Sequence, residues 1–352
     1  MKSEVNSALK AAREEIESSL KKFVTNESES ISNIGNELAP VTSALSHFIL
    51  DSGKRLRPLF SYVGYLGSAK EIRPQIISAC ASLELVHVCA LIHDDLMDGS
   101  DTRRGAPSIH KEFERWHRQN GRSGSPQQYG ASAAILLGDL ALVWAEKALY
   151  QSGLKSDQLL RATSIFSELQ IELMAGQFLD VHEQSSLTSN IDRSRKIARF
   201  KSGKYTIERP LHFGAAISGD SSLQKPYSNY GIPLGEAFQL RDDILGVFGE
   251  SKVTGKPTGD DLLEGKRTVL IAKTFELAGA QGALTLTQVF GNRDASPEMI
   301  EKCKNLIKDC GALTHVEKMI DDLVSQALNA VSGLKNEPLL ARMAEIVTKR
   351  ES

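Results

Sequence analysis

The sequence predicts an all-α fold in the form of a single large helical bundle that comprises residues 1–352. Along most of the chain, apolar residues recur every three or four positions, as they do in amphipathic helices. Sustained alternation of apolar and polar residues, which indicates strands, is nearly absent. Two pairs of adjacent acids, beginning at Asp94 and Asp242, follow apolar runs far apart in the sequence. We therefore expect these pairs on two separate helices of one bundle.

The first half of the chain alternates apolar periodic segments with polar breaks. The spacing predicts helices over residues 5–23, 40–51, 58–67, 74–98 and 131–151. Turn-forming and polar residues predict loops over residues 26–36, 99–109 and 120–128. The segment 131–151 is almost entirely apolar, so we expect that helix to be buried.

The second half continues the helical pattern around one long glycine-rich segment. Helices are predicted over residues 156–182, 192–217 with a break near residue 202, and 224–248, and several short helices over 268–349. Residues 185–190 are rich in Ser and Thr and are predicted to form a turn. Residues 249–266 contain four glycines and one proline. We expect this segment to be a long functional loop rather than a packed element.

Composition and charge are those of an ordinary globular protein. Hydrophobic residues make up 41% of the chain, charged residues 24%, and the formal net charge is −2, so the overall charge gives no sign of nucleic-acid binding. The longest apolar run, residues 131–145, contains Asp139 and is too short to cross a bilayer. Glu4 and Arg13 interrupt the N-terminal segment, and no signal peptide is expected. The cysteines lack CxxC spacing, which favours reduced thiols in a cytoplasmic protein.

The segment 84–105 carries the motif that directs the functional interpretation. On a helix, Asp94 and Asp98 lie one above the other on one face, with Asp95 beside them. Like charges at this spacing repel, so the motif needs a compensating cation. Oxygen ligands without Cys or His favour Mg²⁺, which proteins usually share with substrate phosphates. We therefore expect a phosphorylated or diphosphorylated ligand, with Arg103 and Arg104 close enough to bind it.

An isolated acidic motif is often no more than a solvated helix end. Here Gln239, Asp242 and Asp243 repeat the arrangement after a second apolar run, which makes a chance occurrence less probable.

Taken in order, the motifs of this chain resemble those of the trans-isoprenyl diphosphate synthases, the head-to-tail polyprenyl synthetases. The resemblance covers nearly the whole chain, with matching motifs at residues 53–58, 85–87, 94–98, 103–105, 176–177, 201, 239–243 and 265–267. Residues 205–211 look most like bacterial geranylgeranyl diphosphate synthases. The resemblance implies an all-α bundle of the isoprenoid synthase type around a deep central cavity, and a homodimer.

The reaction implied by this resemblance is Mg²⁺-dependent prenyl transfer. An allylic diphosphate (dimethylallyl, geranyl or farnesyl) loses its diphosphate, the double bond of isopentenyl diphosphate attacks the carbocation, and proton loss gives a product one isoprene unit longer. Diphosphate is a poor leaving group unless its charge is neutralised. The family uses up to three Mg²⁺ ions for this purpose, and Mn²⁺ can substitute.

The resemblance also implies a role for each motif residue. The metal ligands are Asp94, Asp98 and Asp242, supported by Asp95 and Asp243. The expected contacts of the allylic diphosphate are Arg103, Lys201, Lys256 and Gln239. The expected contacts of isopentenyl diphosphate are Lys54, Arg57, His87 and Arg104. Further residues expected to line the site are Gln177, Ser202 and Lys266. We expect Arg55 to be structural.

The second acidic motif departs from the family at one position. Gly246 stands where a third aspartate is common. We expect activity to survive, with the third metal contact supplied by water or by the loop acids Asp260 and Asp261.

Product length is expected to depend on the helix turns before Asp94. In the family, aromatic side chains at the positions of Cys89 and Ala90 stop growth at C15 or below, and both residues are small here. The floor of the cavity is therefore expected deeper, at Val86, Ser82 or the helix over 135–144. We expect C20 geranylgeranyl diphosphate, although the small pair also allows products of C25 or longer.

Three other functions are compatible with parts of the sequence. A non-catalytic subunit of a heteromeric synthase tends to lose the acid clusters, whereas the first is complete here. A terpene cyclase would not need the basic residues Lys54 and Arg57. An HD-type phosphohydrolase, suggested by His93 and Asp94, lacks the additional histidines of such a metal site.

Overall fold

The computed structural model describes residues 2–51, 53–184, 191–249 and 259–349. These residues are almost entirely helical, which confirms the predicted fold class, and their strands are limited to the short pair β1 (Thr102–Arg103) and β2 (Ala106–Pro107). The chain divides into two compact units. Unit 1 comprises Met1–Ser164 and Phe213–Asp220, and unit 2 comprises Ile165–His212 and Ser221–Ser352.

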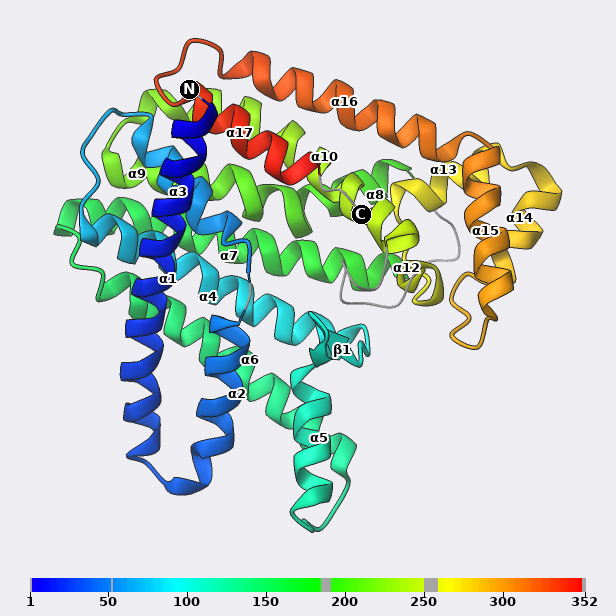
Figure 1. Ribbon diagram of the computed structural model, residues 1–352, viewed down its shortest axis with the longest axis horizontal. Helices are drawn as coiled ribbons and strands as arrows, with labels where there is room; N and C mark the ends of the chain where they lie inside the picture. The colour runs from blue at the N-terminus through cyan, green and yellow to red at the C-terminus, as the bar shows by residue number, and fades with distance from the viewer. Residues whose placement is uncertain (1, 52, 185–190, 250–258, 350–352) are drawn as a thin grey trace. The chain divides into compact units, whose positions relative to one another are not determined.

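Unit 1 is built around one buried helix, α4 (Pro74–Met97), which contacts the helices on either side of it (Figure 1). Its other elements are α1 (Lys2–Ser32), η1 (Asn36–Leu38), α2 (Ala39–Leu50), α3 (Leu56–Leu66), β1, β2, α5 (Ile109–Gln119), α6 (Pro126–Tyr150), the beginning of α7 (Ser156–Gln184) and the end of α9 (Arg209–Ser218). Helix α4 packs against α1, α3 and α6, and apolar residues on nearly all of its sides are buried. This packing explains why its sequence is apolar without being amphipathic.

Three predictions for unit 1 were wrong in detail. Helix α1 continues to Ser32 instead of ending before a loop at residues 26–36, because Val24 and Glu27 extend its buried face and Glu27 Oε2 lies 2.7 Å from Lys147 Nζ of α6. Helix α6 begins at Pro126, inside the predicted loop 120–128. It also buries one face instead of all its sides. The apolar residues that it leaves exposed are Ile135, Leu136, Val143 and Tyr150.

By length and composition, α4 is the single helix among the described residues that could cross a membrane. However, 72% of its most apolar window is buried inside the protein. Burial of this extent is typical of the core helix of a globular protein.

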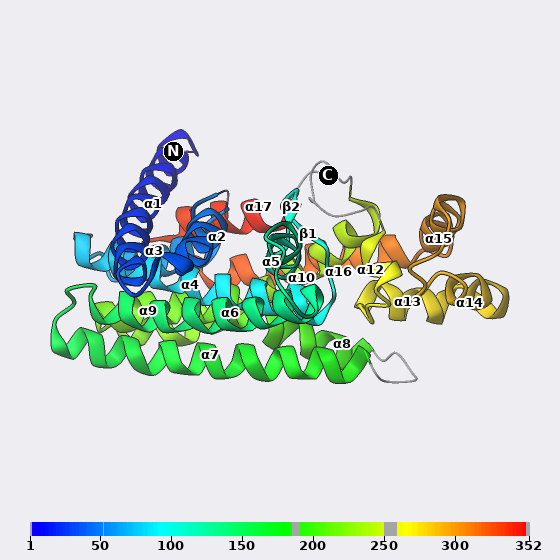
Figure 2. The same ribbon diagram turned by 90° about the horizontal axis from the view of Figure 1, so that it is seen from below.

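Unit 2 is organised around α10 (Gln224–Phe248), which contacts η2, α16 and α17. Its other elements are the remainder of α7, α8 (Ile191–Ile197), the π-helix η2 (Ala198–Glu208), the start of α9 (Arg209–Ser218), η3 (Ser221–Leu223), α12 (Asp260–Leu263), α13 (Val269–Leu277), α14 (Gly279–Thr287), α15 (Pro297–Asp309), α16 (Ala312–Ala330) and α17 (Glu337–Thr348). Figure 2 shows α13, α14 and α15 grouped at one end of this unit, where successive helices contact one another.

Close backbone contact between η2 and α10 depends on two glycines. A Cβ atom at Gly203 would lie 2.9 Å from the carbonyl carbon of Gly235, so neither position has room for a side chain. The predicted break near residue 202 is in fact continuous π-helix, a conformation that often occurs at functional sites.

Part of the predicted loop 249–266 is a packed element. Its described residues include the helical turn α12, in which Leu262 is fully buried within the core of unit 2. The expectation of a loop without packed structure was therefore wrong for residues 260–263.

Candidate functional site

The first acidic motif lies at the C-terminal end of α4 in unit 1. Asp94 and Asp98 are half-buried, and the backbone N–H of Asp98 donates a hydrogen bond to the carbonyl oxygen of Asp94 at 2.8 Å. Asp95 is only 1% exposed. The motif therefore presents two carboxylates with access to solvent, while the third faces the interior.

Asp95 is held by Arg103 of β1. Nε of Arg103 donates to both carboxylate oxygens of Asp95, at 2.9 and 3.1 Å, and its Nη2 also contacts Oδ1. The same Nη2 lies 3.9 Å from Asp94 Oδ2. Burial by itself lowers the pKa of Arg103, but Asp95, with Asp94 and Asp98, raises it overall. Arg103 was predicted to bind the allylic diphosphate. In this structure its guanidinium group holds the carboxylate of Asp95, the buried acid of the motif.

Basic residues gather beside this motif, within unit 1. Burial lowers the pKa of His87 well below its usual range, and the positive charges of Arg57, Arg104, Arg103 and Arg55 lower it further. His87 is therefore neutral at pH 7. The pKa of Arg104 is also lowered, first by burial and then by the neighbouring arginines, although Glu84 opposes this effect.

The backbone holds two of these arginines in an unusual conformation. Arg55 and Arg104 have φ angles of 50° and 54°, in the left-handed region that non-glycine residues seldom adopt. Arg104 Nη1 donates to the carbonyl oxygen of Asp51 at 3.2 Å. Arg57 lies in the first turn of α3 and is 7% exposed, whereas Lys54 is exposed. The structure thus brings together three of the four residues predicted to bind isopentenyl diphosphate, namely Arg57, His87 and Arg104.

Arg55 has a different environment, as the sequence predicted. Its Nη1 donates to Glu84 Oε1 at 2.9 Å, its Nη2 donates to the carbonyl oxygen of Ile49 at 2.8 Å, and both charged side chains are 2% exposed. This buried pair connects the start of α3 with α4.

The second acidic motif, on α10 in unit 2, repeats the arrangement of the first. Asp242 is half-buried, whereas Asp243 is 5% exposed and accepts a hydrogen bond from Gln239 Nε2 at 2.7 Å. Burial, followed by the charges of Asp261 and Asp242, raises the pKa of Asp243 to about 8. Gln239, predicted to bind diphosphate, therefore holds the buried acid, as Arg103 does in the first motif.

Gly246 and Asp261 are in direct contact within unit 2. A Cβ atom at Gly246 would lie 2.1 Å from Oδ2 of Asp261. Lys266 Nζ lies 3.4 Å from Asp261 Oδ1 and 3.2 Å from Glu264 Oε2. Lys266 thus joins the acids around α10.

The predicted residues of α7 and η2 also lie together. Lys201 Nζ is 2.6 Å from Asp180 Oδ2, and both side chains are partly exposed. A Cβ atom at Gly176 would lie 2.4 Å from the backbone nitrogen of Lys201, so glycine is needed for this contact. Gln177 and Ser202, which follow Gly176 and Lys201 in the sequence, are half-buried. Lys256 lies outside the described residues.

A charged network that joins α7, η2 and the first residue of α9 was missed at the level of sequence. Nζ of Lys204 contacts Glu172 Oε1, and Nε of Arg209 donates to Glu172 Oε2 at 2.7 Å. Nη2 of Arg209 also donates to Glu168 at 2.8 Å. The available signal was the charge of Lys204, Glu208 and Arg209 in a segment that was predicted to be helical.

Cys89, one of the two residues expected to control product length, contacts His93, which in turn contacts α6. Cys89 is fully buried, its Sγ is 3.7 Å from His93 Nδ1, and burial raises its pKa to about 12. Nε2 of His93 lies 3.1 Å from the carbonyl oxygen of Ile135. Because both ring nitrogens contact neighbouring groups of the protein, His93 is a packing residue, which argues against the HD-type phosphohydrolase. Ala90 is half-buried.

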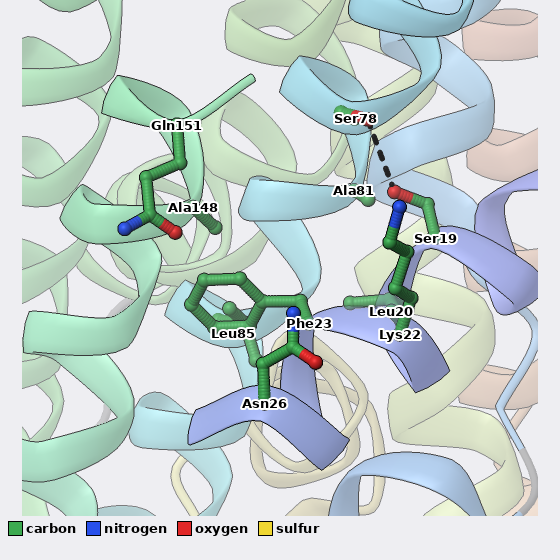
Figure 3. A pocket seen from close by; sticks show the side chains of 10 residues that line it. All are labelled: Ser19, Leu20, Lys22, Phe23, Asn26, Ser78, Ala81, Leu85, Ala148 and Gln151. Carbon is green, nitrogen blue, oxygen red and sulfur yellow. Dashed lines mark hydrogen bonds between the residues drawn. The ribbon is translucent and has the colours of Figure 1, made fainter. Parts of the chain in front are cut away.

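A separate cavity of about 170 Å³ lies in unit 1 among α1, α4 and α6 (Figure 3). Phe23, Ala81 and Leu85 line it, and Ser19 bridges to Ser78 by a hydrogen bond of 3.2 Å at its edge. Leu85 is the one motif residue that lines this cavity, and none of the acidic or basic residues assigned to the site does.

The family is decided by comparison with known protein families. The model of the polyprenyl synthetase family matches residues 39–307, well over half of the 352 residues. The chain belongs to the polyprenyl synthetase family.

Individual members of this family are similar over nearly the whole chain. Geranylfarnesyl diphosphate synthase of Aeropyrum pernix is 33% identical over 320 residues, which cover 88% of this chain and 94% of the relative. Geranylgeranyl diphosphate synthase of Sulfolobus acidocaldarius is 31% identical over 334 residues, which cover 91% and 93%.

A solved structure of a family member extends the likeness to the fold. Geranylgeranyl pyrophosphate synthase from Corynebacterium glutamicum, complexed with isoprenyl diphosphate and magnesium, is 38% identical and has a TM-score of 0.92. The likeness covers 97% of this chain and 99% of that one. The fold of this polyprenyl synthetase is therefore the all-α fold of the family, as the resemblance predicted.

The acids of this polyprenyl synthetase fit a metal that is shared with a ligand. Among the residues that the structure describes, no group of three or more His, Cys, Asp or Glu side chains is arranged to hold a metal ion by itself. Mg²⁺ commonly takes one or two carboxylates and completes its coordination with water and substrate phosphates. Asp94, Asp98 and Asp242, each half-buried as a residue, suit this mode, although Oδ2 of Asp98 is itself buried.

Proposed function

We propose that the chain is a Mg²⁺-dependent prenyltransferase that condenses isopentenyl diphosphate with allylic diphosphates and forms all-trans geranylgeranyl diphosphate. The observation that carries the proposal is the repeated acid pair of α4 and α10. In each pair the first aspartate is half-buried and the second is buried, held by Arg103 or Gln239. Membership of the polyprenyl synthetase family supports this assignment.

Metal binding is assigned to the half-buried acids Asp94, Asp98 and Asp242. Bound Mg²⁺, up to three ions and replaceable by Mn²⁺, would neutralise the leaving diphosphate. Asp95 and Asp243 support these ligands from the interior. Magnesium in the related structure from Corynebacterium glutamicum favours the same metal here.

Cationic and polar side chains are assigned to the two diphosphates. We place isopentenyl diphosphate at Lys54, Arg57, His87 and Arg104. We place the allylic diphosphate near Arg103, Lys201, Lys256 and Gln239. Gln177, Ser202 and Lys266 line the same site. The neutral imidazole of His87 can donate one hydrogen bond without adding charge, while the arginines supply the charge.

The basic group of unit 1 gives a prediction for substrate affinity. Arg57→Gln is expected to raise KM for isopentenyl diphosphate about 10- to 100-fold, since a hydrogen bond to a charged group contributes about 1.5–3 kcal/mol. KM for farnesyl diphosphate should stay constant. The same substitution at the exposed Arg73 is the control. Equal increases in both KM values, measured by steady-state kinetics, would contradict the assignment.

The function is tested by offering the protein Mg²⁺ and labelled isopentenyl diphosphate with dimethylallyl, geranyl or farnesyl diphosphate separately. Chain length is read after dephosphorylation. We expect C20 product with each primer and none in the presence of EDTA. Absence of elongation with every primer would favour a non-catalytic subunit of a heteromeric synthase.

The C20 product is supported by similarity to geranylgeranyl diphosphate synthases, including the Corynebacterium protein. The relative from Aeropyrum pernix, a geranylfarnesyl diphosphate synthase, favours the C25 alternative. A ladder of longer products in the assay would decide for that alternative.

The turn before Asp94 gives a second prediction. Ala90→Phe is expected to shift the main product from C20 to C15, because the larger ring fills the path of the growing chain one helical turn, about 5.4 Å, beyond the acid. The same ring placed at Met97, which is 50% exposed, should leave the product unchanged. Product length in the assay above is the measurement, and a C20 product from Ala90→Phe would refute the role of this residue.

We also propose that the protein is a homodimer through the exposed apolar face of α6. Leu136, Val143 and Tyr150 are 65, 60 and 61% exposed, and their seven-residue spacing places them on one face. Leu136→Glu is expected to give monomers, measured by light scattering after gel filtration. Ile34→Glu, at a residue that is 77% exposed elsewhere in unit 1, should leave the mass unchanged. A monomeric wild-type protein would refute the proposal.

Two broader proposals follow. The two units act as one prenyltransferase domain, because the family match runs through both. A cytoplasmic location is supported by the four cysteines, which are all free and of which three are buried.

A further inference from the structure

One face of α7 contacts the π-helix η2 at three successive turns within unit 2. Glu172, Gly176 and Asp180 are four residues apart, so they lie on the same face of α7. A Cβ atom at Gly176 would lie 2.5 Å from the carbonyl carbon of Phe200 and 2.7 Å from Cα of Lys201. Asp180 Oδ2 lies 2.6 Å from Lys201 Nζ. This face of α7 therefore contacts both the main chain and the side chain of Lys201.

Two ammonium groups of η2 reach along α7 in opposite directions. Lys201, whose backbone adjoins Gly176, binds Asp180, one turn towards the C-terminus of α7. Lys204 binds Glu172, one turn towards the N-terminus. A slide of η2 along α7 in either direction would lengthen one of these ion pairs. Together the two pairs therefore fix the register between η2 and α7.

Arg209 strengthens the pair at Glu172. Its Nε donates to Oε2 of Glu172 at 2.7 Å and its Nη2 donates to Oε1 at 2.8 Å, which is the bidentate geometry of strong carboxylate binding. The side chains of Glu172, Lys204 and Arg209 are 13, 13 and 11% exposed, so solvent screens their charges weakly. Burial by itself raises the pKa of Glu172, but the hydrogen bonds and charges of Arg209 and Lys204 lower it overall. Glu172 is therefore ionised at neutral pH.

The charged network of Glu168, Glu172, Lys204, Glu208 and Arg209 does not itself suit a diphosphate. It contains three acids and two cations, and each cation contacts two of the carboxylates. The net charge of the network is negative, so it repels a further anion. Any effect of the network on a diphosphate must therefore pass through a neighbouring residue.

From this geometry, and resting on the proposed function, we infer that Glu172, Lys204 and Arg209 are positioning residues for the allylic diphosphate. The opposed ion pairs set the register of η2 on α7. That register decides where the ammonium group of Lys201 lies, and so how well it binds the diphosphate of an allylic primer. Loss of Lys204 leaves the pair between Lys201 and Asp180 without its counterpart, and Lys201 moves with the segment.

The test measures KM for farnesyl and isopentenyl diphosphates separately, by steady-state kinetics of the full-length protein. Lys204→Met is expected to raise KM for farnesyl diphosphate about 10-fold, the lower end of the effect of losing a hydrogen bond to a charged group. KM for isopentenyl diphosphate should stay constant, because the basic residues assigned to it lie on other segments. Lys204→Arg retains the cation and should keep both KM values. Lys273→Met is the matched control, since the side chain of Lys273 is also 13% exposed and its Nζ lies 2.9 Å from Glu276.

A double variant shows whether Lys204 acts through Lys201. Lys201→Met should raise KM for farnesyl diphosphate, and adding Lys204→Met should cause no further rise, because the charge that Lys204 positions is already absent. Separate effects that multiply in the double variant would overturn the inference. An unchanged KM for farnesyl diphosphate in Lys204→Met would overturn it too, as would equal rises in both KM values.

Thermal unfolding of the same variants separates positioning from stability. A purely structural role would lower the melting temperature and the amount of active protein without changing either KM, and would overturn the inference. If Lys204→Met does not fold, Arg209→Lys decides by the same ratio of KM values, because it keeps the charge and loses the bidentate contact.

Failure of the proposed function gives a different result. In that case the wild-type protein elongates no allylic primer, and both conclusions are refuted. A wild type that elongates farnesyl diphosphate, together with unaffected KM values in Lys204→Met, refutes the role of the charged network alone.

Discussion

Asp94→Ala should reduce kcat/KM for the condensation of farnesyl and isopentenyl diphosphates about 10²- to 10³-fold, the effect of removing one preorganised electrostatic contact to a developing charge. Asp94 is half-buried at the end of α4, and its carboxylate lies on the same face as Asp98. Without it, the leaving diphosphate is less well neutralised. Steady-state kinetics at saturating Mg²⁺ measure the loss.

The control for this prediction is Asp101→Asn. Asp101 follows the same motif, its side chain is 72% exposed, and its carboxylate contacts Lys111 at 3.2 Å. This variant should retain the activity of the wild type. Thermal unfolding should show that Asp94→Ala keeps its fold, because Asp94 is not part of the buried contact between Arg103 and Asp95. Unchanged turnover in Asp94→Ala would refute its role as a metal ligand.

Arg55→Met should lower the free energy of unfolding by about 3–5 kcal/mol, because it leaves the carboxylate of Glu84 buried without its cation. The two side chains are 2.9 Å apart, and each is 2% exposed. The loss of the hydrogen bond to the carbonyl oxygen of Ile49 adds to the effect. Urea denaturation measures the change.

A second substitution distinguishes the contribution of the ion pair to stability from the contribution of side-chain packing. Arg55→Met combined with Glu84→Leu should recover much of the lost stability, since replacing both partners of a buried pair by apolar residues is often neutral. Lys10→Ala breaks an exposed pair with Glu14, whose atoms are 3.8 Å apart, and should change stability by less than about 1 kcal/mol. A loss in Arg55→Met no larger than that in Lys10→Ala would show that the buried pair contributes little.

Arg55 and Arg57 show how far the sequence alone could assign different roles to two neighbouring residues. Both belong to one basic segment, and the motif selected Arg57 for a substrate and left Arg55 structural. The structure agrees for Arg55, through its pair with Glu84. The identity of that partner was not predictable, because residue 84 lies on another helix and nothing local pairs it with residue 55.

Helix α6 shows a prediction from composition that the structure corrected. Its apolar composition predicted complete burial, yet Leu136 and Val143 are exposed. Composition reports how apolar a helix is, but the neighbours that cover each face are set by packing. Packing also explains why the polar end of α1 is helical: Glu27 forms an ion pair there with Lys147 of α6.

The sequence by itself determined the all-α class, most of the long helices, the family, and the two acid pairs with the basic residues beside the first. These features depend on local periodicity and on spacing within single segments, both of which can be read along the chain. Only the tertiary structure decided which acid of each pair is buried, that Arg103 and Gln239 hold those acids, and that Asp261 fills the space at Gly246. Each of these features depends on how side chains meet after the elements have packed.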